Sequence, residues 1–193
     1  MMDEEYVSRI KLAVELATKK IMAIHRKVRD ENEDRNEIYQ YESLFRAMVY
    51  HELILLGIYF GDITMDNPIN SDKEGLKNKK PDIWIKNTFA LEIKIIRHDK
   101  KENIIKQIHA EKKDSIIEDI VKLSKAVDDL EIKGIMILSH QSPNFSGDED
   151  PVDIMEKEIR KIVRKIKPPE SVILVLCSEE SCKVLKVKEI LRG

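Results

Sequence analysis

Hydrophobic and polar positions follow two periods along this chain, and the changes of period predict its helices and strands. Near the N-terminus, apolar residues recur at three- and four-residue steps, which predicts a helix from Asp3 to Arg29. Its apolar stripe consists of Ile10, Val14, Ala17, Ile21, Ile24 and Val28. A polar, acidic segment interrupts the pattern. A second helix is then expected from Glu37 to Leu56, with Gly57 as its stop.

The rest of the chain alternates between short apolar runs typical of strands and longer stretches typical of helices. Strands are expected at Ile58–Met65, Ile83–Lys86, Phe89–Ile96, Lys133–His140 and Ser171–Cys177. Further helices are expected from Glu102 to Leu130 and, with a proline in the first turn, from Pro151 to Lys167. The tail, Lys183–Ile190, fits either a short edge strand or a final helical turn. This order predicts an α/β fold.

Length and composition fit one domain with an extra N-terminal helix. The chain has 193 residues, of which 42% are hydrophobic and 36% charged, as in a globular rather than a disordered protein. We divide it into the N-terminal helix, residues 1–35, and an α/β domain, residues 36–193. The apolar stripe of the first helix can dock on the domain or pair with a second copy. We favour the second alternative, a homodimer.

Charge and cysteine content narrow the class of protein. The net charge of −2 argues against general affinity for nucleic acid, but residues 73–113 hold twelve Lys/Arg against six Asp/Glu, a local basic excess that suits a polyanion. No apolar run is long enough to span a membrane and no signal peptide is visible, so a cytoplasmic protein without a membrane partner is expected. Cys177 and Cys182 lack zinc-site spacing. We expect reduced thiols, with Cys177 in a strand core and a disulfide as the lesser alternative.

The stretch from Pro81 to Lys94 carries the clearest chemistry. Its two short strands suit a hairpin, and alternate side chains of a strand share a face. Glu92 and Lys94 therefore lie on one face, and pairing of the strands brings Asp82 beside them. Two carboxylates and an ammonium group at one place suit a divalent-metal site with a neighbouring cation. The alternative is an amphipathic edge strand with a solvated Glu–Lys pair.

The sequence Pro81-Asp82, followed after nine residues by Glu92-Ile93-Lys94, resembles the motif of the PD-(D/E)xK nuclease superfamily. The resemblance implies a restriction-endonuclease-like fold, in which helices flank a mixed β-sheet. The expected order of helix, three strands, helix and strand agrees with the core of that fold. It also implies a phosphodiesterase that depends on Mg²⁺, with Mn²⁺ as a substitute, and acts on nucleic acid, DNA rather than RNA. By the same resemblance, Asp82, Glu92 and the main-chain carbonyl of Ile93 are metal ligands, and Lys94 assists the attacking water.

Further site residues stay open. Many members of the superfamily use an acidic residue on the helix before the first strand, and both Glu42 and Glu52 stand on that helix. We prefer Glu42 as a catalytic residue and metal ligand. On the helix after the motif, Gln107, Lys112 and Lys113 are candidates for a polar residue that reaches the site, although each also fits a solvated face.

Two rival functions remain. One is a nuclease-fold protein that has lost catalysis and serves as a DNA-binding protein or scaffold. The other is an unrelated α/β protein that assembles through its long helices.

Overall fold

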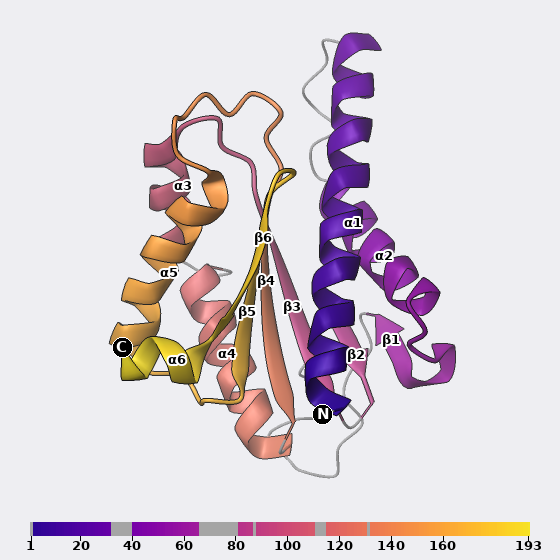
Figure 1. Cartoon of the computed structure of the whole chain (residues 1–193), viewed down its shortest axis with the longest axis vertical. Coiled ribbons are helices and arrows are strands. Elements are labelled where there is room, and N and C mark those ends of the chain that lie inside the picture. The colour runs from indigo at the N-terminus through magenta and orange to yellow at the C-terminus, as the bar shows by residue number, and fades with distance from the viewer. Residues whose placement is uncertain (1, 32–39, 66–80, 87, 111–114, 131) are drawn as a thin grey trace.

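The computed structural model of the chain holds a mixed six-stranded β-sheet between two layers of helices (Figure 1). It describes residues 2–31, 40–65, 81–86, 88–110, 115–130 and 132–193. The strands lie in the sheet in chain order: β1 Ile63–Met65, β2 Ile83–Ile85, β3 Phe89–Ile96, β4 Lys133–His140, β5 Val172–Cys177 and β6 Cys182–Lys186. Strands β1 to β3 are antiparallel, β3 to β5 are parallel, and β6 is antiparallel to β5. The expected α/β fold with a mixed sheet flanked by helices is confirmed.

Helices cover both faces of the sheet (Figure 1). One face carries α1 (Met2–Glu31) and α2 (Gln40–Leu55), and the other carries α3 (Lys101–Ile108), α4 (Ile116–Leu130), α5 (Pro151–Ile166) and α6 (Val187–Arg192). Strand β3 contributes to both cores by alternation. Leu91 and Ile93 join the core under α1 and α2, whereas Ala90 and Ile96 join the core under the other helices.

The expected helix stop at Gly57 is confirmed. Gly57 adopts a φ of 86°, a conformation that favours glycine. Its N–H donates to the carbonyl of Ile54 at 3.0 Å, and the N–H of Ile58 donates to the carbonyl of Leu53, also at 3.0 Å. These two bonds form a Schellman motif, which satisfies carbonyls that the end of α2 would leave without partners.

The start of α5 follows from its first residues. Asp150 is the N-cap, and its carboxylate accepts a hydrogen bond of 2.8 Å from the N–H of Val152. Pro151 occupies the first turn, where its missing N–H costs no helical hydrogen bond. The expected helix from this proline is confirmed.

The stripe of α1 is buried within the chain itself. Among its residues, Ile10, Val14, Ala17 and Ile21 are fully buried in the core that α1 shares with α2 and the sheet. Docking on the domain is therefore how the described stripe is used, and its burial lends no support to a dimer formed through it. In the described parts of the chain, no helix combines the length and apolar character needed to cross a membrane.

The prediction of a single long helix from Glu102 to Leu130 is wrong. The structure has α3 and α4 there, with residues 111–114 outside the described residues. Ser115 starts the second helix, because its hydroxyl accepts a hydrogen bond from the N–H of Glu118 at 3.2 Å. Serine followed three residues later by glutamate is the capping-box pattern, which the periodicity alone does not show.

Two further expectations on element bounds need correction. The first strand begins at Ile63 rather than Ile58, because residues Phe60–Asp62 form a 3₁₀ turn. The tail forms both expected alternatives, the edge strand β6 followed directly by α6.

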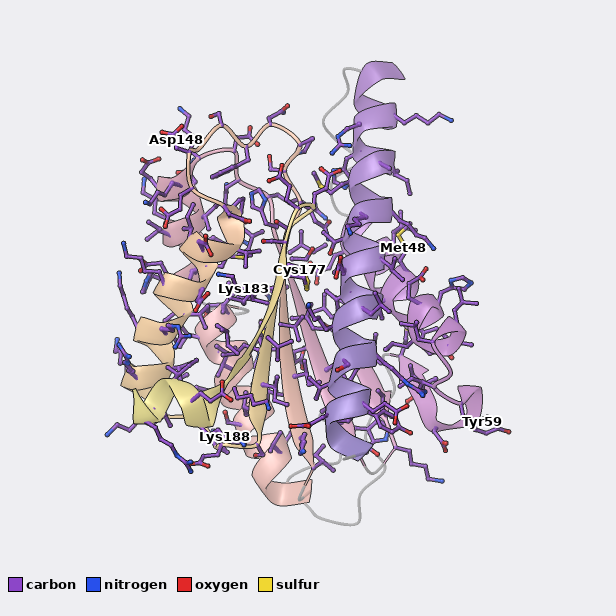
Figure 2. All side chains as sticks on the ribbon, viewed as in Figure 1. Met48, Tyr59, Asp148, Cys177, Lys183 and Lys188 are labelled. Atoms are coloured by element: carbon purple, nitrogen blue, oxygen red, sulfur yellow. A yellow bond between two sulfur atoms is a disulfide. The ribbon has the colours of Figure 1, made fainter. Side chains whose placement is uncertain are left out.

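The expectation of reduced thiols is also wrong. Cys177 and Cys182 are joined by a disulfide across the antiparallel pair β5 and β6, with their Cα atoms 4.1 Å apart. Cys177 is fully buried as expected, and it lies near one end of the sheet (Figure 2). The sequence hid this pairing because only the turn after β5 makes the two residues cross-strand neighbours.

Candidate metal centre

The hairpin of β2 and β3 brings Asp82, Glu92 and Lys94 to one face of the sheet. The register pairs Ile83 with Leu91, so Asp82, the residue before β2, stands opposite Glu92. Even-numbered residues of β3 face α3 and α4, and this is the face that Glu92 and Lys94 share. The hairpin and the division of faces agree with the sequence prediction.

The carboxylate of Asp82 is held from two directions. Its Oδ2 accepts a hydrogen bond of 2.7 Å from the main-chain N–H of Ile93. Its Oδ1 lies 3.0 Å from Nη1 of Arg46, a residue of α2. Only 12% of the Asp82 side chain is exposed, so both contacts occur in a partly dehydrated environment in which charge interactions are stronger than in water.

Lys94 is held by the opposite layer of helices. Its Nζ lies 2.8 Å from Oδ2 of Asp119, a residue in the first turn of α4. Lys122 lies 3.9 Å from the other oxygen of Asp119. The lysine of the motif is therefore fixed by a carboxylate that stands 25 residues further along the sequence.

Among the carboxyl groups in the described part of the chain, Glu92 has the largest shift in pKa. Burial, followed by the negative charges of Asp82 and Asp119, raises the pKa of Glu92 to about 8. The positive charges of Lys94 and Arg46 act in the opposite direction and are too weak to compensate. We call these five residues, Asp82, Glu92, Lys94, Arg46 and Asp119, the Asp82 cluster.

The donor set of the Asp82 cluster fits a hard divalent cation. Mg²⁺ binds through one or two carboxylates and keeps several waters, which Asp82 and Glu92 can satisfy. The main-chain groups of one strand residue point to the same side, so the carbonyl of Ile93 faces the side on which its N–H meets Asp82. Over the described residues, no group of three or more His, Cys, Asp or Glu side chains is arranged to hold a metal ion. A cation here would therefore depend on the two carboxylates, the carbonyl and water.

The remaining candidates from the sequence lie at different distances from this centre. Glu42 pairs with Arg46 at 2.7 Å, four residues on, and so reaches Asp82 through that guanidinium. Glu52 is buried under α1 and pairs with Lys20. Lys112 and Lys113 lie outside the described residues.

Gln107 approaches the edge of β3 beside the cluster. Its Nε2 donates a hydrogen bond of 3.0 Å to the carbonyl of Ile95, next to Lys94 in the strand. Its Oε1 is buried and has no hydrogen-bond partner in the described part of the chain. An acceptor in this position can orient a water or a polar ligand that enters the site.

Sequence reasoning missed Arg46 and Asp119, although both leave a signal. Arg46 follows the helical spacing of the buried residues Val49 and Leu53, and Asp119 stands beside the buried Ile120. A charged residue on the buried side of an amphipathic helix requires a partner, because burial of an unpaired charge is costly. The sequence does not say which strand residue supplies that partner.

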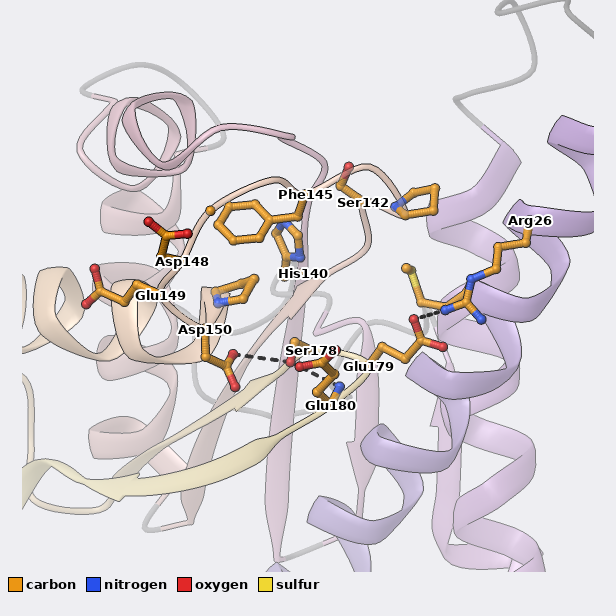
Figure 3. A pocket seen from close by; sticks show the side chains of 14 residues that line it. Arg26, His140, Ser142, Phe145, Asp148, Glu149, Asp150, Ser178, Glu179 and Glu180 are labelled. Atoms are coloured by element: carbon orange, nitrogen blue, oxygen red, sulfur yellow. Dashed lines mark hydrogen bonds and ion pairs between the residues drawn. The ribbon is translucent and has the colours of Figure 1, made fainter.

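Apart from the Asp82 cluster, the structure has a hollow of about 500 Å³ at the carboxyl ends of β4 and β5 (Figure 3). It contains none of the residues of the Asp82 cluster. We call it the β4–β5 hollow; its polar lining includes Arg26, His140, Asp148, Glu149, Asp150, Glu179 and Glu180. Burial lowers the pKa of His140, whose Nε2 donates to the carbonyl of His98 at 2.9 Å.

Three of the five acidic residues that line the β4–β5 hollow have structural partners. Asp150 caps α5 and accepts a hydrogen bond of 2.6 Å from Ser181. Glu149 pairs with Lys101, and Glu179 pairs with Arg26 (Figure 3). The hollow is therefore rimmed by contacts that join loops to helices.

In comparisons with known proteins, no family model, no curated protein and no solved structure matches the chain. The class that the structure defines is a mixed α/β protein with a charged cluster to which the β2–β3 hairpin and both layers of helices contribute. The resemblance to the PD-(D/E)xK superfamily stays a prediction.

Proposed function

We propose that this chain is a metal-dependent phosphodiesterase that cleaves nucleic acid, DNA rather than RNA, within a restriction-endonuclease-like fold. The observation that carries the proposal is the position of Asp82 opposite Glu92, with Lys94 two residues further on the same strand face. Mg²⁺ is the proposed cofactor and Mn²⁺ its substitute. A cytoplasmic location remains an expectation, and the disulfide removes the support that reduced thiols would have given it.

Asp82 and Glu92 are the proposed side-chain ligands of the cation, with the Ile93 carbonyl and Glu42 as further ligands. The N–H of Ile93 fixes one carboxylate oxygen of Asp82, which orients the other. The raised pKa of Glu92 means that its carboxyl group holds a proton near neutral pH without a cation, and ligation requires that proton to leave. When bound, the cation lowers the pKa of a coordinated water and offsets charge on the phosphate.

Lys94 is proposed to act on the attacking water or on a non-bridging phosphate oxygen. Its ammonium group can donate to either, and the contact with Asp119 fixes its direction. Asp119 is thus a positioning residue rather than a catalytic one. Gln107 is well placed to assist, because its buried Oε1 can accept a hydrogen bond from water. By family resemblance, the products carry 5′-phosphate and 3′-hydroxyl ends.

The second candidate function is a nuclease-fold protein without catalysis, which binds DNA or serves as a scaffold. One observation favours it: Asp82 and Lys94 are already engaged by Arg46 and Asp119. Ion pairs of this kind can hold the cluster together without a bound metal ion. Metal binding separates the two candidates, since only the enzyme requires it.

The test is cleavage of a mixed set of labelled single-stranded, duplex and branched DNAs in Mg²⁺ and in Mn²⁺. Wild-type protein is compared with Asp82→Ala and Glu92→Ala, and with Glu180→Ala as a control that removes an exposed glutamate of the β4–β5 hollow. We expect cleavage by the wild type and the control, and none by the two cluster variants. Circular dichroism checks that all four proteins are folded.

Cleavage by either cluster variant at the wild-type rate would contradict the assignment. If the wild type cleaves no substrate, a calorimetric titration with Mn²⁺ decides between the candidates. Mn²⁺ binding that is lost in Asp82→Ala and Glu92→Ala would support the enzyme, with a substrate outside the tested set. Absence of Mn²⁺ binding would support the DNA-binding or scaffold protein.

A further inference from the structure

Arg46 links the two acidic residues that would surround a cation on the α2 side of the cluster. Its Nη1 lies 3.0 Å from Oδ1 of Asp82, and its Nη2 lies 2.7 Å from Oε1 of Glu42. These are the residues expected, with Glu92, to supply side-chain oxygens to the metal. The guanidinium therefore already neutralises ligands that a cation would need.

The charges of the cluster explain why a cation and Arg46 compete. In the metal-free protein, Asp82 pairs with Arg46 and Asp119 pairs with Lys94. A divalent ion bound to Asp82 would place its charge beside the guanidinium of Arg46. Like charges that share one carboxylate repel each other, and the repulsion is stronger where they are partly dehydrated. Arg46 is the cation that must move, because its partner Asp82 is the proposed metal ligand, whereas Lys94 stays paired with Asp119.

Glu42 gives Arg46 a second position. Its side chain is 38% exposed and lies one helical turn before Arg46, so its Oε1 can retain the guanidinium after the cation takes Asp82, and its Oε2 is left as the oxygen for the cation. The guanidinium then lies beside the metal ligands and toward solvent. Its planar fork of donors matches two oxygens of a phosphate group, which a lysine in the same place would bind only as a point charge.

We propose that Arg46 exchanges partners: it neutralises Asp82 in the metal-free protein, and it binds a non-bridging phosphate oxygen of the DNA strand once a divalent cation occupies Asp82. This inference rests on the proposed function. It adds a phosphate-binding residue that the sequence motif does not contain, and it makes cation binding and DNA binding depend on each other.

The exchange predicts effects of opposite sign in one variant. Arg46→Gln removes the competing charge and should bind Mn²⁺ about tenfold more tightly in a calorimetric titration without DNA. The same variant should bind a short labelled duplex about tenfold more weakly in fluorescence anisotropy with saturating Mn²⁺. Arg46→Lys, which keeps the charge but not the fork, should return Mn²⁺ affinity toward the wild-type value and restore duplex affinity only in part.

Arg160→Gln is the matched control. Arg160 forms the same type of pair, four residues after Glu156, on α5 and outside the cluster. Its removal subtracts the same charge and should leave both affinities within about twofold of wild type. Thermal melts of each variant verify that the fold is retained.

The two levels of the proposal fail in different ways. If Arg46→Gln binds Mn²⁺ no more tightly than the wild type, or binds the duplex equally well, the exchange is wrong. If Arg46→Gln weakens the binding of both Mn²⁺ and the duplex, Arg46 only supports the shape of the site, and the exchange is again wrong. The Asp82→Asn variant tests the proposed function separately. If it binds Mn²⁺ as tightly as the wild type, Asp82 is not a metal ligand and the proposed metal site is wrong.

Discussion

The Asp82 cluster and the β4–β5 hollow both contain several carboxylates, but these carboxylates differ in how they affect the stability of the fold. In the hollow, Asp150 caps a helix and Glu179 pairs with Arg26, so these carboxylates join separate elements. In the cluster, Glu92 is partly buried beside two other carboxylates, and its pKa is raised to about 8. A raised carboxyl pKa means that the ionised form is less stable in the folded protein than in water.

The difference shows that the visible hollow is not the better candidate for chemistry. Open sheets often bind ligands at the carboxyl ends of their parallel strands, which is where the β4–β5 hollow lies. Asp150, Glu149 and Glu179 are nevertheless explained by stabilising contacts. In the cluster, Asp82 and Lys94 are also paired, but the pKa of Glu92 is raised, and perturbed ionisation of partly buried groups is typical of functional sites.

The largest expected effect separates the two regions by activity. Lys94→Gln should lower the rate of DNA cleavage by about 10²- to 10³-fold, because the variant loses an ammonium group beside the reacting phosphate. Arg26→Gln removes a cation from the hollow and should leave the rate within about twofold. Initial rates with the best substrate from the mixed set measure both. Equal losses in the two variants would end the distinction between the regions.

The next largest expected difference between the cluster and the hollow is in how the free energy of unfolding depends on pH. The folded pKa of Glu92 lies above its ordinary value of 4.5, so between pH 4.5 and about 8 the folded state holds more protons than the unfolded state. This residue therefore makes the free energy of unfolding fall as pH rises through that window, with no further change above it. Glu92→Gln should raise the free energy of unfolding by about 2–3 kcal/mol at pH 7 and flatten the slope.

Urea unfolding of metal-free protein at several pH values measures this effect. Glu179→Gln is the comparison in the hollow, and it should give no gain because it loses the pair with Arg26. A Glu92→Gln variant that is less stable than wild type at pH 7 would show that the glutamate is ionised and well paired.

The disulfide at the rim of the hollow should have a smaller effect. Cys177 and Cys182 close a short loop that carries Glu179, so reduction by dithiothreitol should lower the free energy of unfolding by about 2 kcal/mol. The Cys182→Ser variant should be insensitive to the reductant. Mn²⁺ affinity at the cluster should stay unchanged on reduction, and a parallel change would mean that the two regions are coupled.

The smallest expected effect concerns the cap of α5. Asp150→Ala should lower the free energy of unfolding by about 1 kcal/mol, because the N–H of Val152 loses its acceptor. Asp148→Ala, two residues earlier and exposed, should change it by less than about 0.5 kcal/mol. A difference of this size would confirm that acidic residues of the hollow stabilise the fold according to their contacts rather than their charge.

Local pattern was sufficient for much of the fold. Alternation in β3 predicted which residues join the core, and Gly57 and Pro151 predicted the end of one helix and the start of another. The prediction failed between α3 and α4, where one continuous helix was expected and the cap at Ser115 marks the start of a second one. The cysteines were misjudged because their pairing depends on a turn of four residues between two strands.

The sequence by itself determined the hairpin that carries Asp82, Glu92 and Lys94, because strand alternation and a short turn are local properties. Only the tertiary structure decided which distant charges meet them. Arg46 arrives from one helical layer and Asp119 from the other, and both contacts depend on how the helices dock on the sheet. Docking is set by packing of side chains far apart in sequence, and no periodicity within a segment records it.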